Sequence, residues 1–380
     1  MSRNFFLFYI FLSTVFLSTG YSQNLHFQWA RQYGSENTSN QLKSLVSDNA
    51  NHVFAFTDFE HEFTINGNTY VSEGESDLLF YSIDEDGNID WVVHEGGIGK
   101  EIAQQIKCDI DGNIYLMGKF VNTLTINGVS YESNGTFDMF LAKYSNNGDF
   151  EWCKTFGGPN SESLVSIFIQ YGVITVAGRF YDYTVIEEDT LVSQSGTDIL
   201  LAKFNTDGDL LNTHTIGGES VDMVSSMDFD VYGNIYITGD FYQTISFGDD
   251  TFDAGDMLGI YIAKYDPSFN LQWAYQIDGD DLKPGVKIGV SSEGECTVSG
   301  SYSSNLHFGS TSLNTTVSDE DIFLANFSTE GEVNWAQRFH SNSAESVFDL
   351  KVDRLGGIYM TGYYLTSITF GSYTVSYTLC

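Results

Sequence analysis

Acidic residues recur at one position of a repeated spacing, and carboxylates that converge are the groups that hold a cation in proteins. The position lies ten residues after a recurring tryptophan slot, and its occupants along the chain are Ser39, Glu101, Glu162, Asp222, Lys283 and Glu345. Carboxylate oxygens suit Ca²⁺, and carboxylates that approach one another tolerate their charges poorly unless a cation is present. Glu101, Glu162, Asp222 and Glu345 are therefore the candidate site for calcium or a cationic group.

These four acids have a second interpretation that the residues leave open. An acidic side chain at the entry to a strand is commonly solvated, or it accepts hydrogen bonds from nearby backbone amides. Under that interpretation the acids hold no ligand. The sequence supplies no firm catalytic, cofactor-binding or metal-ligating residue beyond these four.

Other catalytic and metal-binding patterns are weak or missing in the sequence. The 7 histidines are scattered without the short paired spacing of a metal site, and neither a G-x-S-x-G elbow nor a P-loop occurs. The strings Asp109–Asn113 and Asn205–Asp209 resemble fragments of calcium loops. They lack the third alternating ligand and the distant glutamate of a complete loop, so we interpret them as turns capped by their own Asp and Asn side chains.

The acids belong to a structural repeat that covers most of the chain. The tryptophan slot recurs at a spacing of about 61 residues, and it is filled by Trp29, Trp91, Trp152, Asn212, Trp273 and Trp335. An aromatic residue that ends each T-G-x-F-like segment keeps the same spacing, at Phe59, Phe120, Phe180, Phe241, Tyr302 and Tyr364. Two independent markers with one period predict repeat units near 29–90, 91–151, 152–211, 212–272, 273–334 and 335–380.

Each unit contains four short strands joined by tight turns. In one unit we expect strands at 224–230, 234–241, 259–265 and 271–277, with the T-I-S-F-G piece Thr244–Gly248 leading through a polar loop to the third. Four strands per unit without helical spacers are typical of a propeller blade. The sequence therefore predicts an all-β fold, a single β-propeller of six four-stranded blades. The recurring tryptophans should fill the wedges between neighbouring sheets.

The last predicted blade lacks a third strand like Asp138–Tyr144, so Tyr373–Leu379 substitutes for it or the chain is truncated. The segment around Trp29 has the register of a fourth strand with no blade before it. We expect it to complete the last blade and close the ring.

Two recurring strings resemble a known family. The segments Ile110–Phe120 and Asp138–Tyr144, and their counterparts Gly233–Phe241 and Asp198–Phe204, look like the SBBP-type β-propeller repeat of exported and surface proteins in Bacteroidetes-like bacteria. The resemblance implies a propeller in an exported, often cell-surface protein, and it implies no reaction. Ala142–Trp152 is also similar to the tryptophan-docking motif of quinoprotein propellers, but the repeats offer no cluster that would hold a quinone.

Composition and the N-terminal residues bear on localisation and partners. The formal charge of −35 argues against binding nucleic acid or anionic membranes, which need Lys and Arg patches. Residues 1–22 combine Arg3, an apolar stretch and small residues at Gly20 and Ser22, which predicts a signal peptide cut before residue 23. The mature propeller, residues 23–380, is then secreted or on the cell surface, with no membrane span. The 4 cysteines share no metal-ligand spacing, and we interpret them as incidental apolar residues, with one disulfide as the alternative.

Together these features favour a non-enzymatic binding or scaffold propeller that is exported and monomeric. Its partner would be an extracellular protein or glycan that the sequence does not identify, and no cofactor is implied apart from calcium. An exported propeller hydrolase or lyase acting on polysaccharide is the alternative, and a purely structural module of a larger envelope protein is the third.

Overall fold

The computed structural model describes residues 42–315, 320–340, 345–365, 367–370 and 373–376. These residues form strands, turns and loops, and they contain no α-helix, as the sequence predicts. Consequently no helix within the described ranges is long and apolar enough to cross a membrane. The predicted signal peptide and the segment around Trp29 lie outside the described residues.

The first two units are separate four-stranded antiparallel sheets. The first has the order β1-β2-β5-β6, built from β1 (Ser44–Ser47), β2 (Val53–Phe59), β5 (Asp77–Ile83) and β6 (Ile89–Glu95). The second repeats this order with β7 (Lys100–Cys108), β8 (Ile114–Val121), β11 (Asp138–Tyr144) and β12 (Phe150–Phe156).

The third and fourth units share one long strand. They consist of β13 (Ser163–Gln170), β14 (Val173–Ile186), β15 (Asp189–Asn205), β16 (Leu210–Phe229), β17 (Ile235–Phe247), β18 (Asp250–Tyr265) and β19 (Leu271–Gly279). The first part of β16 pairs with β15 as the outer strand of the third unit, and its last part pairs with β17 as the inner strand of the fourth. The fifth unit comprises β20 (Lys287–Val290), β21 (Cys296–Tyr302), β24 (Asp321–Phe327) and β25 (Val333–Phe339), and β26 (Glu345–Val352) with β27 (Ile358–Tyr364) begins a sixth.

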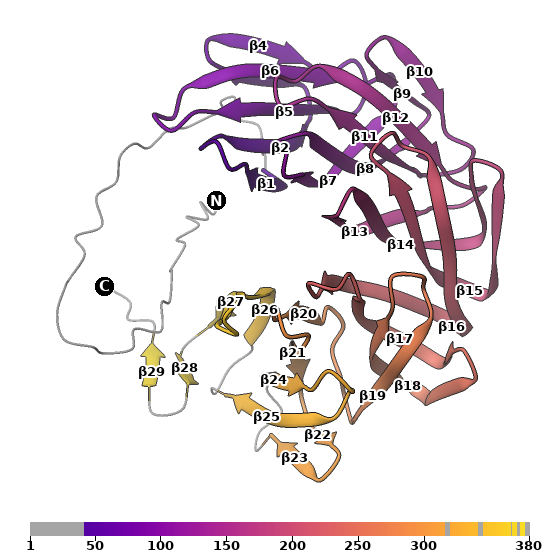
Figure 1. Cartoon of the computed structure of the whole chain (residues 1–380), viewed down its shortest axis with the longest axis vertical. Helices are drawn as coiled ribbons and strands as arrows, with labels where there is room; N and C mark the ends of the chain where they lie inside the picture. The colour runs from indigo at the N-terminus through magenta and orange to yellow at the C-terminus, as the bar shows by residue number, and fades with distance from the viewer. Residues whose placement is uncertain (1–41, 316–319, 341–344, 366, 371–372, 377–380) are drawn as a thin grey trace, which may run out of the picture.

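The units follow one another around a common centre, with the first strand of each unit innermost (Figure 1). The inner strands β1, β7, β13, β16, β20 and β26 contact each other in that sequence. The fold is therefore the predicted all-β propeller. The first and last sheets are not joined by a strand pair among the described residues, so the number of blades and closure by the Trp29 segment stay predictions.

One prediction about the connections is wrong. The segment after the T-I-S-F-G piece is not the predicted polar loop. Residues 250 to 253 pair with Thr244 to Phe247 and form the second strand of a hairpin. The same hairpin occurs in the other units as β3 (Glu62–Ile65) with β4 (Asn68–Val71), β9 (Thr123–Ile126) with β10 (Val129–Glu132), β22 (Asn305–Phe308) with β23 (Thr311–Asn314), and β28 (Ser367–Phe370) with β29 (Tyr373–Ser376). The first two units turn at Asn-Gly pairs with two positive φ angles, as at Asn127 (48°) and Gly128 (75°), and the fourth turns at Gly248, whose φ is 61°.

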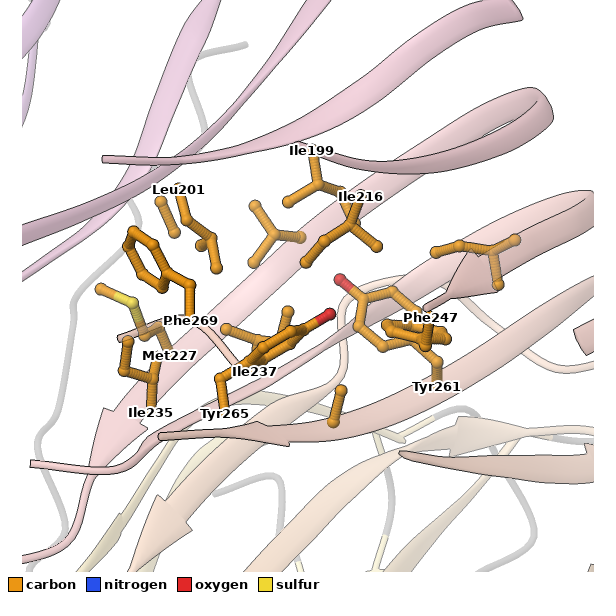
Figure 2. Close-up of a cluster of buried hydrophobic side chains, with 14 of the residues drawn as sticks. Ile199, Leu201, Ile216, Met227, Ile235, Ile237, Phe247, Tyr261, Tyr265 and Phe269 are labelled. Carbon is orange, nitrogen blue, oxygen red and sulfur yellow. The ribbon is translucent and has the colours of Figure 1, made fainter. Parts of the chain in front are cut away.

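The core lies between neighbouring units rather than at the centre. The third strands β5, β11 and β24 are buried at every residue, which fits strands that are covered on both faces. One cluster joins Leu201 of the third unit to Ile237 and Met227 of the fourth (Figure 2). Every wedge between adjacent sheets thus buries side chains from both, so each unit depends on its neighbours for stability.

The tryptophans seal these wedges, as the sequence predicts. Trp152 Nε1 donates a hydrogen bond to the Thr206 carbonyl of the next unit at 3.0 Å, and Trp273 Nε1 donates to the Thr329 carbonyl at 2.9 Å. A Cβ atom on Gly208 would lie 2.9 Å from the Trp152 ring, so only glycine leaves room for the indole there.

Candidate functional site

The four predicted carboxylates lie at the junctions between units. Glu101, Glu162 and Glu345 stand at the entry to the inner strands β7, β13 and β26, and Asp222 stands within β16 where its inner part begins to pair with Phe241. Each of the four is 0% exposed. They do not line an open mouth, so the interpretation of these acids as solvated side chains is wrong.

The junctions at Glu101, Glu162 and Asp222 each hold a second buried acid from the preceding unit. Asp77, Asp138 and Asp198 lie at or within the third strands, at 0%, 1% and 0% exposure. A Cβ atom on Gly96, Gly157 or Gly217 would lie 2.2 Å from the carboxyl carbon of the corresponding Asp, so glycine is needed beside each. Backbone hydrogen bonds join the two segments, from Glu101 N to Ser76 O at 3.1 Å and from Glu162 N to Phe137 O at 2.9 Å. The two acids of a junction are thus brought together by the pairing of successive units.

The backbone satisfies part of this buried charge. Asp138 accepts a hydrogen bond from Asn134 N at 3.0 Å and Asp198 accepts one from Gln194 N at 2.9 Å, in each case four residues upstream. Asp222 accepts one from Gly218 N at 2.7 Å, also four residues upstream. The amides of Gly97 and Gly158, at the same separation of four residues, act on Glu101 and Glu162 and lower their pKa, but neither contact satisfies the full geometry of a hydrogen bond. Because these amides do not compensate for the loss of water, burial favours the protonated form of both groups.

Burial therefore raises the pKa of the acids at three junctions. The pKa of Glu101 is raised to about 8, mainly by burial and further by the Asp77 charge. Burial raises the pKa of Glu162 and of Asp222 to about 7, and the charges of Asp138 and Asp198 add to the effect. A proton held by one member of each pair relieves the repulsion between them. The pairs can therefore persist in the fold without a cation.

The junction between the fourth and fifth units shows that the acids belong together. Gly259 occupies the position of Asp138, and Lys283 occupies the position of Glu162. Gly259 packs against the Phe241 ring, and the Lys283 side chain turns to Asp281, with Nζ 2.6 Å from Oδ1. Both acids are absent from the same junction, which indicates that they act as a pair in holding units together.

The cation hypothesis stays a prediction. The structure places one candidate acid at each junction and does not gather the four around a single point. Within the described ranges, no group of three or more His, Cys, Asp and Glu side chains is arranged to hold a metal ion.

The predicted turn chemistry is confirmed. Asp109 Oδ1 accepts hydrogen bonds from Asp111 N at 3.0 Å and Asn113 N at 2.8 Å, which is the capping expected for these strings. Cys108, Cys153 and Cys296 are free thiols, and Cys380 lies outside the described residues.

Sequence reasoning missed a group of charges where the inner strands converge. Lys107 of β7 is close enough to Asp228 of β16 and to Asp349 and Lys351 of β26 for their charges to affect its pKa, which burial lowers. Lys287 of β20 is influenced by the same β26 residues, and burial lowers its pKa too. The group contains charges of both signs, and Asp228 accepts a hydrogen bond from Val290 N at 2.9 Å, which joins β16 to β20. No single sequence segment carries this pattern, because its members come from four units.

Comparison with known proteins gives a likeness of fold alone. No family model and no curated protein matches the chain. A member of the DUF4221 family from Bacteroides vulgatus is 13% identical over 86% of this chain and 89% of its own, with a TM-score of 0.39. The WD40 domain of Pan2 from Neurospora crassa is 9% identical over 85% and 86%, with a TM-score of 0.37. A K499G mutant of NanB sialidase from Streptococcus pneumoniae is 9% identical over 84% of this chain and 55% of its own, with a TM-score of 0.34. The resemblance to SBBP-type repeats stays a prediction.

Proposed function

We propose that the protein is an exported, non-enzymatic binding or scaffold propeller. The observation that carries the proposal is the sealing of its perturbed acids. Strongly shifted carboxyl groups in an open cleft are candidates for general acid and base. Here Glu101, Glu162 and Asp222 are 0% exposed, and each lies at a different junction. A group that substrate cannot touch transfers no proton to it, so these acids support a structural role.

The same repetition indicates where binding resides. The tryptophans and the acid pairs make the same kind of contact at successive junctions, so the features that the units share hold the scaffold together. Ligand specificity then depends on residues that differ from unit to unit, on loops or at irregular junctions.

The test is a binding and turnover screen of the purified chain from residue 23 onward. We expect retention of an extracellular glycan or protein on the immobilised chain, without release of new reducing ends or unsaturated sugars from a polysaccharide panel. Sustained product release would overturn the proposal and favour the hydrolase or lyase. A triple variant, Glu101→Gln, Glu162→Gln and Asp222→Asn, is the control: its retention of ligand should match that of the parent if the acids only hold units together.

A further inference from the structure

One junction lacks both the indole that fills the wedge elsewhere and the glycine that receives it. In the second unit Tyr115, Lys143 and Trp152 stand side by side on adjacent strands, and in the fourth Tyr236, Lys264 and Trp273 do the same. The same register in the third unit holds Thr175, Lys203 and Asn212. Compared with the second and fourth units, two large aromatic side chains are replaced by two small polar ones. The fifth unit also has a threonine at the tyrosine position, Thr297, but it keeps its tryptophan, Trp335.

A third change compensates for part of the lost volume. The glycine that receives the indole at the other junctions is replaced by Phe269, which has a φ of +65°. Its ring is 6% exposed and points into the cluster that contains Leu201 and Met227 (Figure 2). Lys203 Nζ lies 4.6 Å above this ring, whereas Lys264 Nζ lies 5.1 Å above the tyrosine of its own unit. Phe269 therefore fills the inner part of the vacated space.

The outer part stays open as a pocket of about 390 Å³. Thr175, Lys203 and Asn212 line it together with the stacked rings of Phe168 and Phe229, whose centroids are 4.1 Å apart. Its rim includes Tyr171 and Tyr232, which are 79% and 70% exposed. A pocket with apolar walls and a few polar groups is the usual form of a small-molecule site.

The cation in this pocket differs from its counterpart in the second unit. Lys143 pairs with Glu151, with Nζ 2.8 Å from Oε2, but Leu211 occupies the glutamate position in the third unit. No carboxylate of the described residues lies within 4.0 Å of Lys203 Nζ, which donates one hydrogen bond to the Pro267 carbonyl. The acid that does influence Lys203 is Asp266, and it caps its own turn by accepting from Ser268 N and Asn270 N. The Lys203 side chain is thus a buried cation without an ion-pair partner.

We propose that this pocket binds a small planar aromatic carboxylate. The ring would take the place that an indole occupies at the neighbouring junctions, against Phe168 and Phe229, and the carboxylate would pair with Lys203. In the second unit Lys143 Nζ and Trp152 Nε1 both donate to the Thr206 carbonyl, at 3.2 and 3.0 Å. An aromatic ring in the equivalent space of the third unit would therefore have its edge beside the lysine ammonium. The inference rests on the proposed binding function and names a ligand class for it.

The test is calorimetric titration with indole-3-carboxylate at about 0.15 M salt, where the field of the remote acidic surface is screened beyond about 8 Å. We expect saturable binding to the parent and at least tenfold weaker binding of indole-3-carboxamide and of cyclohexanecarboxylate. Asn212→Trp should abolish binding, because the new indole fills the pocket. The double variant Asn212→Trp with Phe269→Gly restores the tryptophan and glycine of the neighbouring junctions, and it should also fail to bind, without a clash between the indole and Phe269. Lys203→Met should weaken binding at least tenfold, whereas Lys264→Met, the matched change at a sealed junction, should not.

Circular dichroism and melting of each variant establish that it is folded. No saturable binding to the parent, equal affinity for the acid and the amide, or undiminished binding to a folded Asn212→Trp variant would overturn the proposal. Retention of a glycan or protein by the same preparation would then leave the proposed function standing. Product release in the polysaccharide screen would remove the proposed function without affecting the pocket.

Discussion

Replacing the partly buried Trp152 with alanine is expected to lower the free energy of unfolding by about 3 kcal/mol, the low end of the usual cost of deleting a large aromatic side chain from a core. The indole packs on Gly208 of the next unit, lies 6.3 Å from the Tyr115 ring, and donates to the Thr206 carbonyl. Its removal opens a cavity in a wedge that both units need. Urea unfolding of parent and variant at one pH measures the difference.

Asn212→Ala is the matched control, because Asn212 has the same register in the next unit but its side chain makes only a 3.5 Å hydrogen bond to Ser268 O. We expect this change to cost about 0.5 kcal/mol, as for a substitution outside the core. Equal losses in the two variants would show that the tryptophan does not seal the wedge.

Raising the pH from 6 to 9 is expected to destabilise the protein. The pKa of Glu101 is about 8 in the folded chain against 4.5 for an unperturbed glutamate, and burial raises those of Glu162 and Asp222 to about 7. A carboxyl group with a raised folded pKa contributes stability that is complete below the unfolded pKa and is lost as the pH rises through the folded pKa. Above pH 6 the folded chain keeps the Glu101 proton for about two further pH units and the Glu162 and Asp222 protons for about one each. Since each unit corresponds to about 1.4 kcal/mol, the summed loss over this range should be about 5 kcal/mol.

Chemical unfolding at pH 6 and pH 9, at constant ionic strength, measures this loss. The triple variant Glu101→Gln, Glu162→Gln and Asp222→Asn should show a much smaller difference between the two pH values, whatever its absolute stability. An unfolding free energy that is constant or increases between pH 6 and pH 9 in the parent would contradict ionisable buried pairs at the junctions.

The period of the sequence was enough to predict the fold, because glycine turns and recurring aromatics carry it directly. The outer hairpins were missed although Asn66-Gly67 and Asn127-Gly128 are strong hairpin signals. These hairpins come between the second and third strands of a unit and have a similar length from one unit to the next, so the period of the repeat could be found without recognising them.

The burial of the acids could not be predicted from strand alternation. Glu101 stands at the entry of its strand, where too few residues precede it for the alternation of polar and apolar side chains to show which face is buried. Its partner Asp77 comes from another unit. One signal was present in the sequence, since Gly259 and Lys283 depart from the acidic pattern in the same unit. Likewise the vacant slot at Asn212 was visible, but the pocket also required Thr175 and Phe269, which only strand register brings together.

Carboxyl footprinting of the native protein tests most directly whether the repeated acids are sealed. The chain is labelled with a water-soluble carbodiimide and an amine at neutral pH, and the modified peptides are quantified by mass spectrometry. We expect Glu101, Glu162 and Asp222, all 0% exposed, to react at least about tenfold more slowly than the exposed Asp111 and Asp207, because they react only after local opening. Labelling of the three acids at the rate of Asp111 would contradict their burial at the junctions and would restore them as candidates for a ligand site or a catalytic centre.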